Sequence, residues 1–137
     1  MAWRGGDEKN GYELWIDAPR RLLRFRFWGF WKEALGIAYR EDCFAAMREV
    51  SMRGKWFVLA DLTDYPPQRP DVQACHAATM VRAHELGMHA AANLVNVTLS
   101  QMQIRRLSEQ SGLPEFAFFQ SEAKALAYID ELNAKTE

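Results

Sequence analysis

Polar side chains stand at the C-terminal ends of three apolar segments that are typical of buried strands. In open α/β sheets, ligands bind beyond the carboxyl ends of the parallel strands, where helix N-termini present free N–H groups. These positions could hold a small polar or anionic ligand. The hydroxyls could equally cap helices, and capping alone accounts for Ser100 and Ser121. The candidate ligand-binding residues are Asp61, Thr63, Thr98, Ser100 and Ser121.

The histidines and cysteines do not have the spacing of a metal site or of a nucleophilic centre. His76, His84 and His89 include no i, i+4 pair of the kind that binds zinc on a helix, and we expect them to be exposed or half-buried. Cys43 lies on an apolar helical stripe, where a small buried hydrophobe is expected. No Gly-x-Ser-x-Gly turn and no glycine-rich phosphate loop follows a strand. The sequence therefore predicts no metal, no cofactor and no assembled catalytic group.

A basic segment is the best case for nucleic-acid binding. Four arginines fall within seven residues, beside two tryptophans that could stack on bases. The alternative is a solvated sheet face in which Arg24 packs over Trp15 and Arg26 pairs with Glu13. With 17 Lys and Arg against 18 Asp and Glu, the net charge is −1, which favours this alternative. We expect no nucleic-acid partner. The residues concerned are Arg20, Arg21, Arg24, Arg26, Trp15 and Trp28.

Two runs of alternating apolar residues, 12–17 and 22–27, predict an antiparallel hairpin around these arginines. Residues 18–21 can form its turn, because Pro19 presets the backbone angle that a turn needs. A tight turn centred on Pro19 and Arg20 fixes the register. One face then pairs Ile16 with Leu23, Leu14 with Phe25 and Tyr12 with Phe27, and the other pairs Trp15 with Arg24 and Glu13 with Arg26.

The rest of the chain alternates helical and strand patterns. An apolar stripe from Leu35 to Val50 predicts a first helix that stops at Gly54, and the continuous apolar run 56–60 predicts a strand covered on both faces. Asp71 could cap the second helix and Ser121 the last one. Further helices are predicted at 71–86, 100–111 and 121–132, and further strands at 91–97 and 115–119.

The element order ββαβαβαβα predicts one α/β domain with a mixed five-stranded sheet, an N-terminal hairpin and helices packed on the sheet. A chain of 137 residues fits one domain. We expect residues 1–11 to be a flexible lead, 12–133 the domain, and 134–137 a flexible tail. We see no targeting signal and no apolar run of membrane-spanning length, and two cysteines form no disulfide framework. A cytoplasmic protein without a membrane partner is expected.

The order of elements and several local runs resemble the STAS domain, the SpoIIAA-like fold of bacterial anti-sigma-factor antagonists, and most closely small uncharacterised STAS-like proteins. The resemblance covers about residues 12–132 and is carried by structural motifs, so it implies the fold more than an activity. In the antagonists a phosphorylated serine begins the helix after the central strand. Residues 70–75 contain no Ser or Thr, so that switch does not transfer here. The runs that carry the likeness are Gly29-Phe30-Trp31 and the segments 58–62, 103–107 and 118–129.

The resemblance and the lack of a catalytic constellation together predict a non-enzymatic regulatory or protein-interaction module with an unknown protein partner. The alternative is a protein or enzyme that binds a small anionic or lipid-like molecule at the strand ends. We also expect a homodimer that forms through an aromatic turn after the hairpin, because clustered exposed aromatic rings are typical of interfaces. The residues of that expected interface are Trp28, Phe30 and Trp31.

Overall fold

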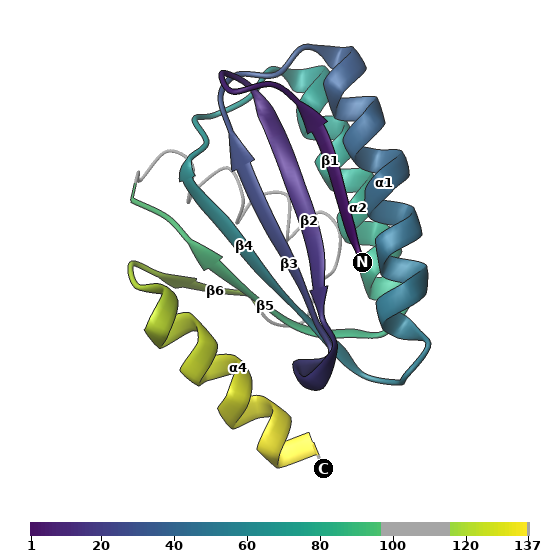
Figure 1. Cartoon of the computed structure of the whole chain (residues 1–137), viewed down its shortest axis with the longest axis vertical. Helices are drawn as coiled ribbons and strands as arrows, with labels where there is room; N and C mark the ends of the chain where they lie inside the picture. The colour runs from purple at the N-terminus through teal and green to yellow at the C-terminus, as the bar shows by residue number, and fades with distance from the viewer. Residues whose placement is uncertain (97–115, 137) are drawn as a thin grey trace.

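The computed structural model describes residues 1–96 and 116–136. A six-stranded sheet forms its centre, with the strands arranged in chain order (Figure 1). The first three strands form an antiparallel meander, and β3 to β6 run parallel to one another. The strands are β1 (Ala2–Gly6), β2 (Gly11–Asp17), β3 (Leu22–Trp28), β4 (Trp56–Asp64), β5 (Met88–Leu94) and β6 (Phe116–Phe119).

Three α-helices lie within the described residues: α1 (Glu33–Ser51), α2 (Pro70–Glu85) and α4 (Glu122–Thr136). They confirm an α/β fold with a mixed sheet. The predicted strand at 56–60 is confirmed as part of β4, which is buried and lies inside the sheet. The predicted helix at 100–111 lies outside the described residues.

The predicted hairpin is confirmed in its register. Tyr12 pairs with Phe27, Leu14 with Phe25, and Ile16 with Leu23. The turn is the short 3₁₀ segment η1 (Ala18–Arg20), with Pro19 in its first turn, and Arg21 closes it in the left-handed region at φ 53°. Alternation of apolar residues is therefore enough to define this part of the sheet.

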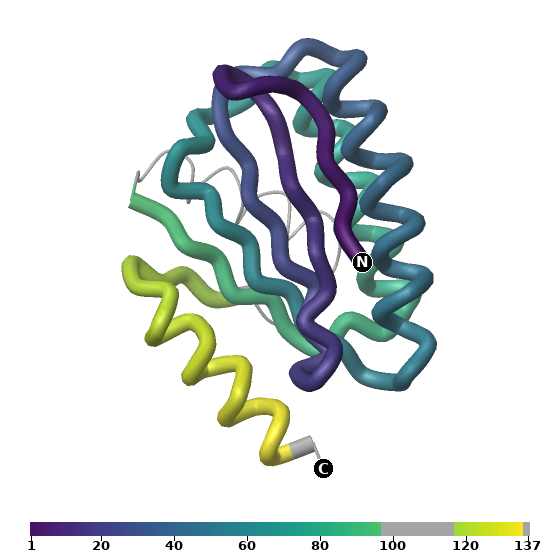
Figure 2. Tube along the Cα trace, viewed as in Figure 1, coloured from purple at the N-terminus to yellow at the C-terminus, as the bar shows by residue number. Residues whose placement is uncertain are grey.

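The first strand corrects the sequence prediction. Within the segment 1–11, which we expected to be a flexible lead, residues 2–6 form β1, the edge strand beside β2 (Figure 2). The connecting turn is held by Asp7, whose N–H donates to the carbonyl of Asn10 at 2.9 Å and whose Oδ1 accepts the N–H groups of Lys9 and Asn10. The sheet therefore has six strands rather than five.

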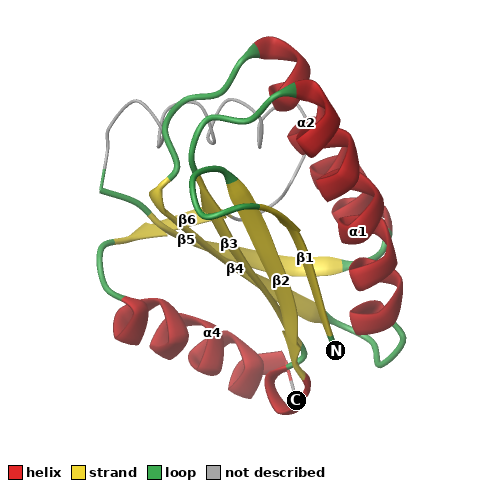
Figure 3. Cartoon of the chain, turned by 45° about the horizontal axis from the view of Figure 1, so that its top comes forward, coloured by secondary structure: helices red, strands yellow, loops and turns green. Residues whose placement is uncertain are grey.

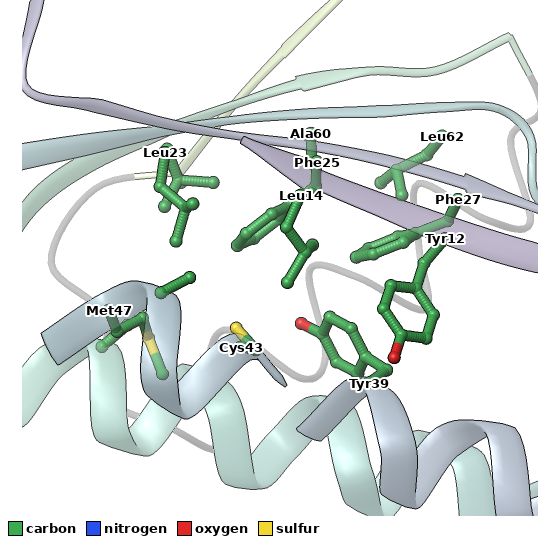
Figure 4. Close-up of a cluster of buried hydrophobic side chains, with 14 of the residues drawn as sticks. Tyr12, Leu14, Leu23, Phe25, Phe27, Tyr39, Cys43, Met47, Ala60 and Leu62 are labelled. Atoms are coloured by element: carbon green, nitrogen blue, oxygen red, sulfur yellow. The ribbon is translucent and has the colours of Figure 1, made fainter. Parts of the chain in front are cut away.

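Helices cover the two faces of the sheet unequally. The pair α1 and α2 lies on one side, and α4 lies on the other (Figure 3). The larger core fills the space below α1 and α2, where Tyr39, Cys43 and Met47 of α1 face the apolar side chains of β2, β3 and β4 (Figure 4). The smaller core lies under α4 and contains Leu22, Phe57, Leu59, Ala90, Ala92, Leu94, Ala125 and Ile129.

The helix N-termini agree with the sequence prediction at one position and not at another. Ser121 caps α4, since its Oγ accepts the N–H of Lys124 at 3.3 Å. Asp71 does not cap α2: the cap position is Arg69, which makes no side-chain cap hydrogen bond. Asp71 lies inside the first turn instead and forms an ion pair with Arg69 at 2.8 Å. The carboxylate still lies near the positive end of the helix dipole.

Candidate interaction surface

Two of the candidate strand-end residues, Asp61 and Thr63, lie together at the end of β4. Oδ1 of Asp61 accepts the backbone N–H of Thr63 at 3.1 Å and its hydroxyl at 2.7 Å. These polar groups therefore satisfy one another within the last residues of β4. Ser121 acts as a helix cap, and Thr98 and Ser100 lie outside the described residues.

The aromatic turn differs from the predicted exposed patch. Trp31 is fully buried: its N–H donates to Oε1 of Gln68 at 2.8 Å and its indole N–H to the carbonyl of Trp28 at 3.0 Å. The chain turns inward at Gly29, whose φ is 80° and where a Cβ would lie 2.1 Å from the carbonyl of Lys9. Trp31 therefore belongs to the core, which corrects its assignment to an interface.

The other two aromatic residues of the turn keep some exposure. Trp28 is half-buried and donates its indole N–H to the carbonyl of Asp7 at 2.9 Å. Phe30 is 53% exposed, and its backbone N–H donates to Oδ1 of Asn10. The β1–β2 turn thus packs against the aromatic turn within one chain.

The titratable groups of the larger core are structural. His76 is buried, which corrects the expected exposed or half-buried position, and burial lowers its pKa to about 4. Burial also raises the pKa of the Cys43 thiol to about 12, as expected for a cysteine on an apolar stripe. Both side chains are uncharged at neutral pH. Within residues 1–96 and 116–136, no cluster of three or more His, Cys, Asp or Glu side chains could hold a metal ion.

On the side of α4, no described helix covers β1, β2 and the later part of β3, whereas Leu22 at the start of β3 is buried under α4. That helix packs on β4, β5 and β6. Strand alternation places a group of charged and aromatic side chains on this uncovered part of the sheet, which we call the open face. Its tryptophans are half-buried, and its arginines and glutamate range from 19% to 75% side-chain exposure. The open face consists of Arg4, Glu13, Trp15, Arg24, Arg26 and Trp28.

Arginines stack on both tryptophans of the open face. The guanidinium of Arg24 lies 5.2 Å from the centre of the Trp15 ring, which confirms the predicted contact. The guanidinium of Arg26 lies 5.0 Å from the Trp28 ring. The predicted ion pair of Arg26 with Glu13 is wrong. Glu13 pairs instead with Arg4 of β1 at 2.9 Å, a partner hidden from the sequence analysis because β1 was not predicted.

One row of side chains crosses the open face with alternating charge. In strand register, Arg4 lies beside Glu13, Glu13 beside Arg26, and Arg26 beside Asp61 of β4. A positive, a negative, a positive and a negative residue therefore stand on four adjacent strands. Beside the β1–β2 turn, the face widens into an open cleft of about 480 Å³ that Arg4, Arg26 and Trp28 help to line.

The hairpin arginines all have partners within the chain. Arg20 bridges Asp17 at 2.9 Å and Asp130 at 2.8 Å. Arg26 reaches Asp64 at 3.9 Å. Arg24 bonds to Glu122, and Arg21 bonds to Asn133. Such local pairing reduces the positive potential that a nucleic-acid backbone would require.

No protein-family model matches the chain, and no curated protein sequence matches it. A solved structure is similar: an uncharacterized protein from the DUF3478 family with a SpoIIAA-like fold, from Shewanella loihica PV-4. The two chains are 15% identical, with a TM-score of 0.66 over 91% of this chain and 98% of that chain. The fold is therefore SpoIIAA-like, and at this identity the likeness concerns the fold alone.

In the part of the chain that the structure describes, no helix combines the length and the apolar character that a bilayer span requires.

Proposed function

We propose that this SpoIIAA-like chain is a non-enzymatic protein-interaction module that docks a partner protein through its open face. One observation carries the proposal. The half of the sheet below α4 is covered, whereas the half formed by β1–β3 presents two half-buried tryptophans with arginines stacked on them. Tryptophan and arginine are the residues most enriched where interfaces gain their binding energy.

The energetics of the two tryptophans support docking. An indole ring buries about 150–250 Å² when it is fully covered. Trp15 and Trp28 remain half-buried in the isolated chain, so a partner could remove further apolar surface from water. Their arginines are already ordered by stacking, which lowers the entropy lost when a partner binds.

The first turn of α2 bears on how such a module is regulated. This turn consists of Pro70, Asp71, Val72 and Gln73. The carboxylate of Asp71 is already paired with Arg69. No hydroxyl residue lies where the resemblance would place a phosphorylated serine. Docking through the open face does not require that switch.

A photocrosslinking amino acid tests the proposal in cells that express the full chain. We expect protein adducts when it replaces Trp15 or Arg26 on the open face, and none when it replaces Val81, an exposed residue on the opposite side of the sheet. Adducts from Thr63 alone would place the docking site at the strand end and would contradict docking through the open face. Absence of protein adducts at both open-face positions would contradict the proposed function.

A further inference from the structure

We infer that the partner protein docks on the open face with one amphipathic α-helix, which lies along β2 beside α4 and contacts Trp15 and Trp28 together. This inference rests on the proposed docking function of the open face, for which it names the kind of segment that binds. It follows from the width of the uncovered strip of sheet and from the spacing of the two tryptophans along that strip.

The uncovered strip is about as wide as one helix. It comprises β1, β2 and the later part of β3, because α4 packs on β4, β5 and β6 and buries Leu22 at the start of β3. Neighbouring strands lie about 4.8 Å apart, so β1 and β3 are separated by about 10 Å. An α-helix with its side chains is about 10–12 Å in diameter. One helix on β2 therefore covers the strip.

The chain itself shows how a helix covers this side of the sheet. α4 runs roughly along β5 and leaves the layer beside it open over the first strands (Figures 1 and 3). It packs mainly on β5, and β2 is three strands away from β5, a distance of about 14 Å. Close-packed helices lie about 8–10 Å apart. A helix centred on β2 therefore fits beside α4 and leaves the bond between Arg24 and Glu122 in place between them.

The two tryptophans of the open face both lie over β2. Trp15 belongs to β2, and Trp28 of β3 pairs with Gly11 of β2 in register. The indole of Trp28 packs directly against Gly11, where a Cβ would lie 2.7 Å from the ring. A glycine at this position thus allows the ring of Trp28 to lie across β2, on the same line along the sheet as Trp15.

The spacing along this line matches two turns of a helix. Gly11 and Trp15 are four residues apart on β2, which corresponds to about 13 Å in a strand. In an α-helix, residues i and i+7 or i+8 lie on one face and about 11–12 Å apart. Two apolar side chains at such positions can therefore contact Trp15 and Trp28 at the same time.

The charged side chains of the open face form a polar border around the two rings. Arg4 and Glu13 pair with each other at 2.9 Å, and Arg24 bonds to Glu122. Because these charges already have partners within the chain, a docked helix gains its binding free energy from apolar contact with the indole rings, and the ion pairs stay as they are.

Other occupants cover the strip less well. A partner sheet is wider than the strip and would extend over β4, where α4 already lies. A single extended segment has the width of one strand, about 4.8 Å, and leaves much of the strip in water. A small molecule in the open cleft of about 480 Å³ would contact Trp28, whereas Trp15 does not line that cleft. A helix is the occupant that reaches both rings.

The expected association is transient. Three strands over about five residues give a strip of about 240 Å² in plan. Stable complexes bury roughly 800 Å² per partner. We expect a dissociation constant of about 1 µM or weaker, so the complex is best captured by a covalent crosslink.

Photocrosslinks mapped to single residues of the partner test the inference in cells that express the full chain. A photoreactive phenylalanine replaces Trp15 in one variant and Trp28 in another, and mass spectrometry identifies the residues of the partner that it labels. We expect both variants to label one segment of one protein, at sites about seven to nine residues apart. Sites about four residues apart would indicate an extended segment. That spacing, or sites in unconnected segments, would overturn the inferred helix.

A second measurement shows whether one occupant needs both rings. The photoreactive residue replaces Arg26, which lies on the row between Trp15 and Trp28. In this background, Trp15→Ala and Trp28→Ala should each lower the adduct yield about fivefold or more. Phe30→Ala is the matched control, because it removes an exposed aromatic ring outside the open face, and it should leave the yield unchanged. Circular dichroism and thermal melting of each variant show that it is folded.

The outcomes distinguish the inferred helix from the proposed function. If the yield falls with only one of the two tryptophans, the contact does not span both rings, and the inferred helix is overturned while docking on the open face stands. A yield that falls equally in Phe30→Ala would also overturn it. If no open-face position forms a protein adduct, the proposed function itself fails, and the inferred helix fails with it.

Discussion

The hydroxyl of Tyr65 lies 2.7 Å from Nε2 of His76, a residue of α2, and both side chains are buried. The imidazole is surrounded by the rings of Phe27, Trp31 and Tyr39 at centroid distances of 4.8 to 5.4 Å. Burial in this apolar surrounding disfavours the imidazolium and lowers the pKa of His76 to about 4. His76 is thus a core residue whose charge state is coupled to folding.

Stability should therefore fall in mild acid. The pKa of His76 is near its ordinary value of 6.5 in the unfolded chain and is lowered to about 4 by burial in the folded chain. Between these two pKa values the unfolded state binds more protons than the folded state. The contribution of uncharged His76 to the free energy of unfolding is therefore fully present above pH 6.5 and is lost as the pH falls through 4. We expect about 2 kcal/mol of this contribution to disappear between pH 7 and pH 5. Urea unfolding at the two pH values measures it.

The control for this prediction uses two variants. His76→Phe should unfold with a smaller difference between pH 7 and pH 5 than the wild type, whereas His84→Gln, which changes an exposed histidine, should keep the full difference. Equal pH dependence in all three proteins would show that His76 does not titrate as its burial implies.

A second prediction concerns the contact between α1 and α2. Gly36 lies where the helices approach closely, since a Cβ there would be 3.3 Å from Sγ of Cys75 and 3.5 Å from Val72. Gly36→Val should lower the free energy of unfolding by about 1–3 kcal/mol, because the added branches have no room. Ala38→Val adds a similar side chain at an exposed position of the same helix and should cost about 0.5 kcal/mol or less. If both variants lose a similar free energy of unfolding, the low helix propensity of valine, and not the close packing at Gly36, explains the loss.

A third prediction concerns the two cysteines. Cys43 and Cys75 are buried free thiols, and burial raises the pKa of both. The thiolate is the reactive form, so neither residue should react with an aromatic disulfide reagent while the protein is folded. Both should react after unfolding in urea. Phe30→Cys adds an exposed thiol and should react at once in the folded protein; rapid labelling of the wild type would contradict the burial of its thiols.

Much of the fold is predictable because local patterns agree with the final structure. The hairpin register follows from alternation over Tyr12–Phe27, and the buried strand β4 follows from a continuous apolar run. The burial of Trp31 was not predicted, because the local pattern and the final structure disagree at this residue. A turn at a glycine with positive φ reverses the direction of the chain, and alternation does not extend through it.

The open face could likewise be predicted only where its contacts are local in sequence. Its contacts within the hairpin, such as Arg24 over Trp15, could be predicted from register. Its charged row could not, because Arg4 comes from a strand rich in glycine and Asp61 from a strand that is distant in sequence. Whether a sheet half is covered depends on the placement of α4, which no local pattern encodes.

The edge strand supplies the last prediction. Trp3 of β1 is half-buried and packs against the larger core, although the sequence suggested a flexible lead. Trp3→Ala should therefore lower the free energy of unfolding by about 1–3 kcal/mol, since part of an indole's apolar surface returns to water. Arg4→Ala, on the same strand, removes only an exposed ion pair with Glu13 and should cost about 1 kcal/mol or less. Chemical denaturation of the two variants measures the difference. If Trp3→Ala unfolds at the same denaturant concentration as the wild type, β1 adds no stability, and the segment 1–11 behaves in solution as the flexible lead that its composition predicted.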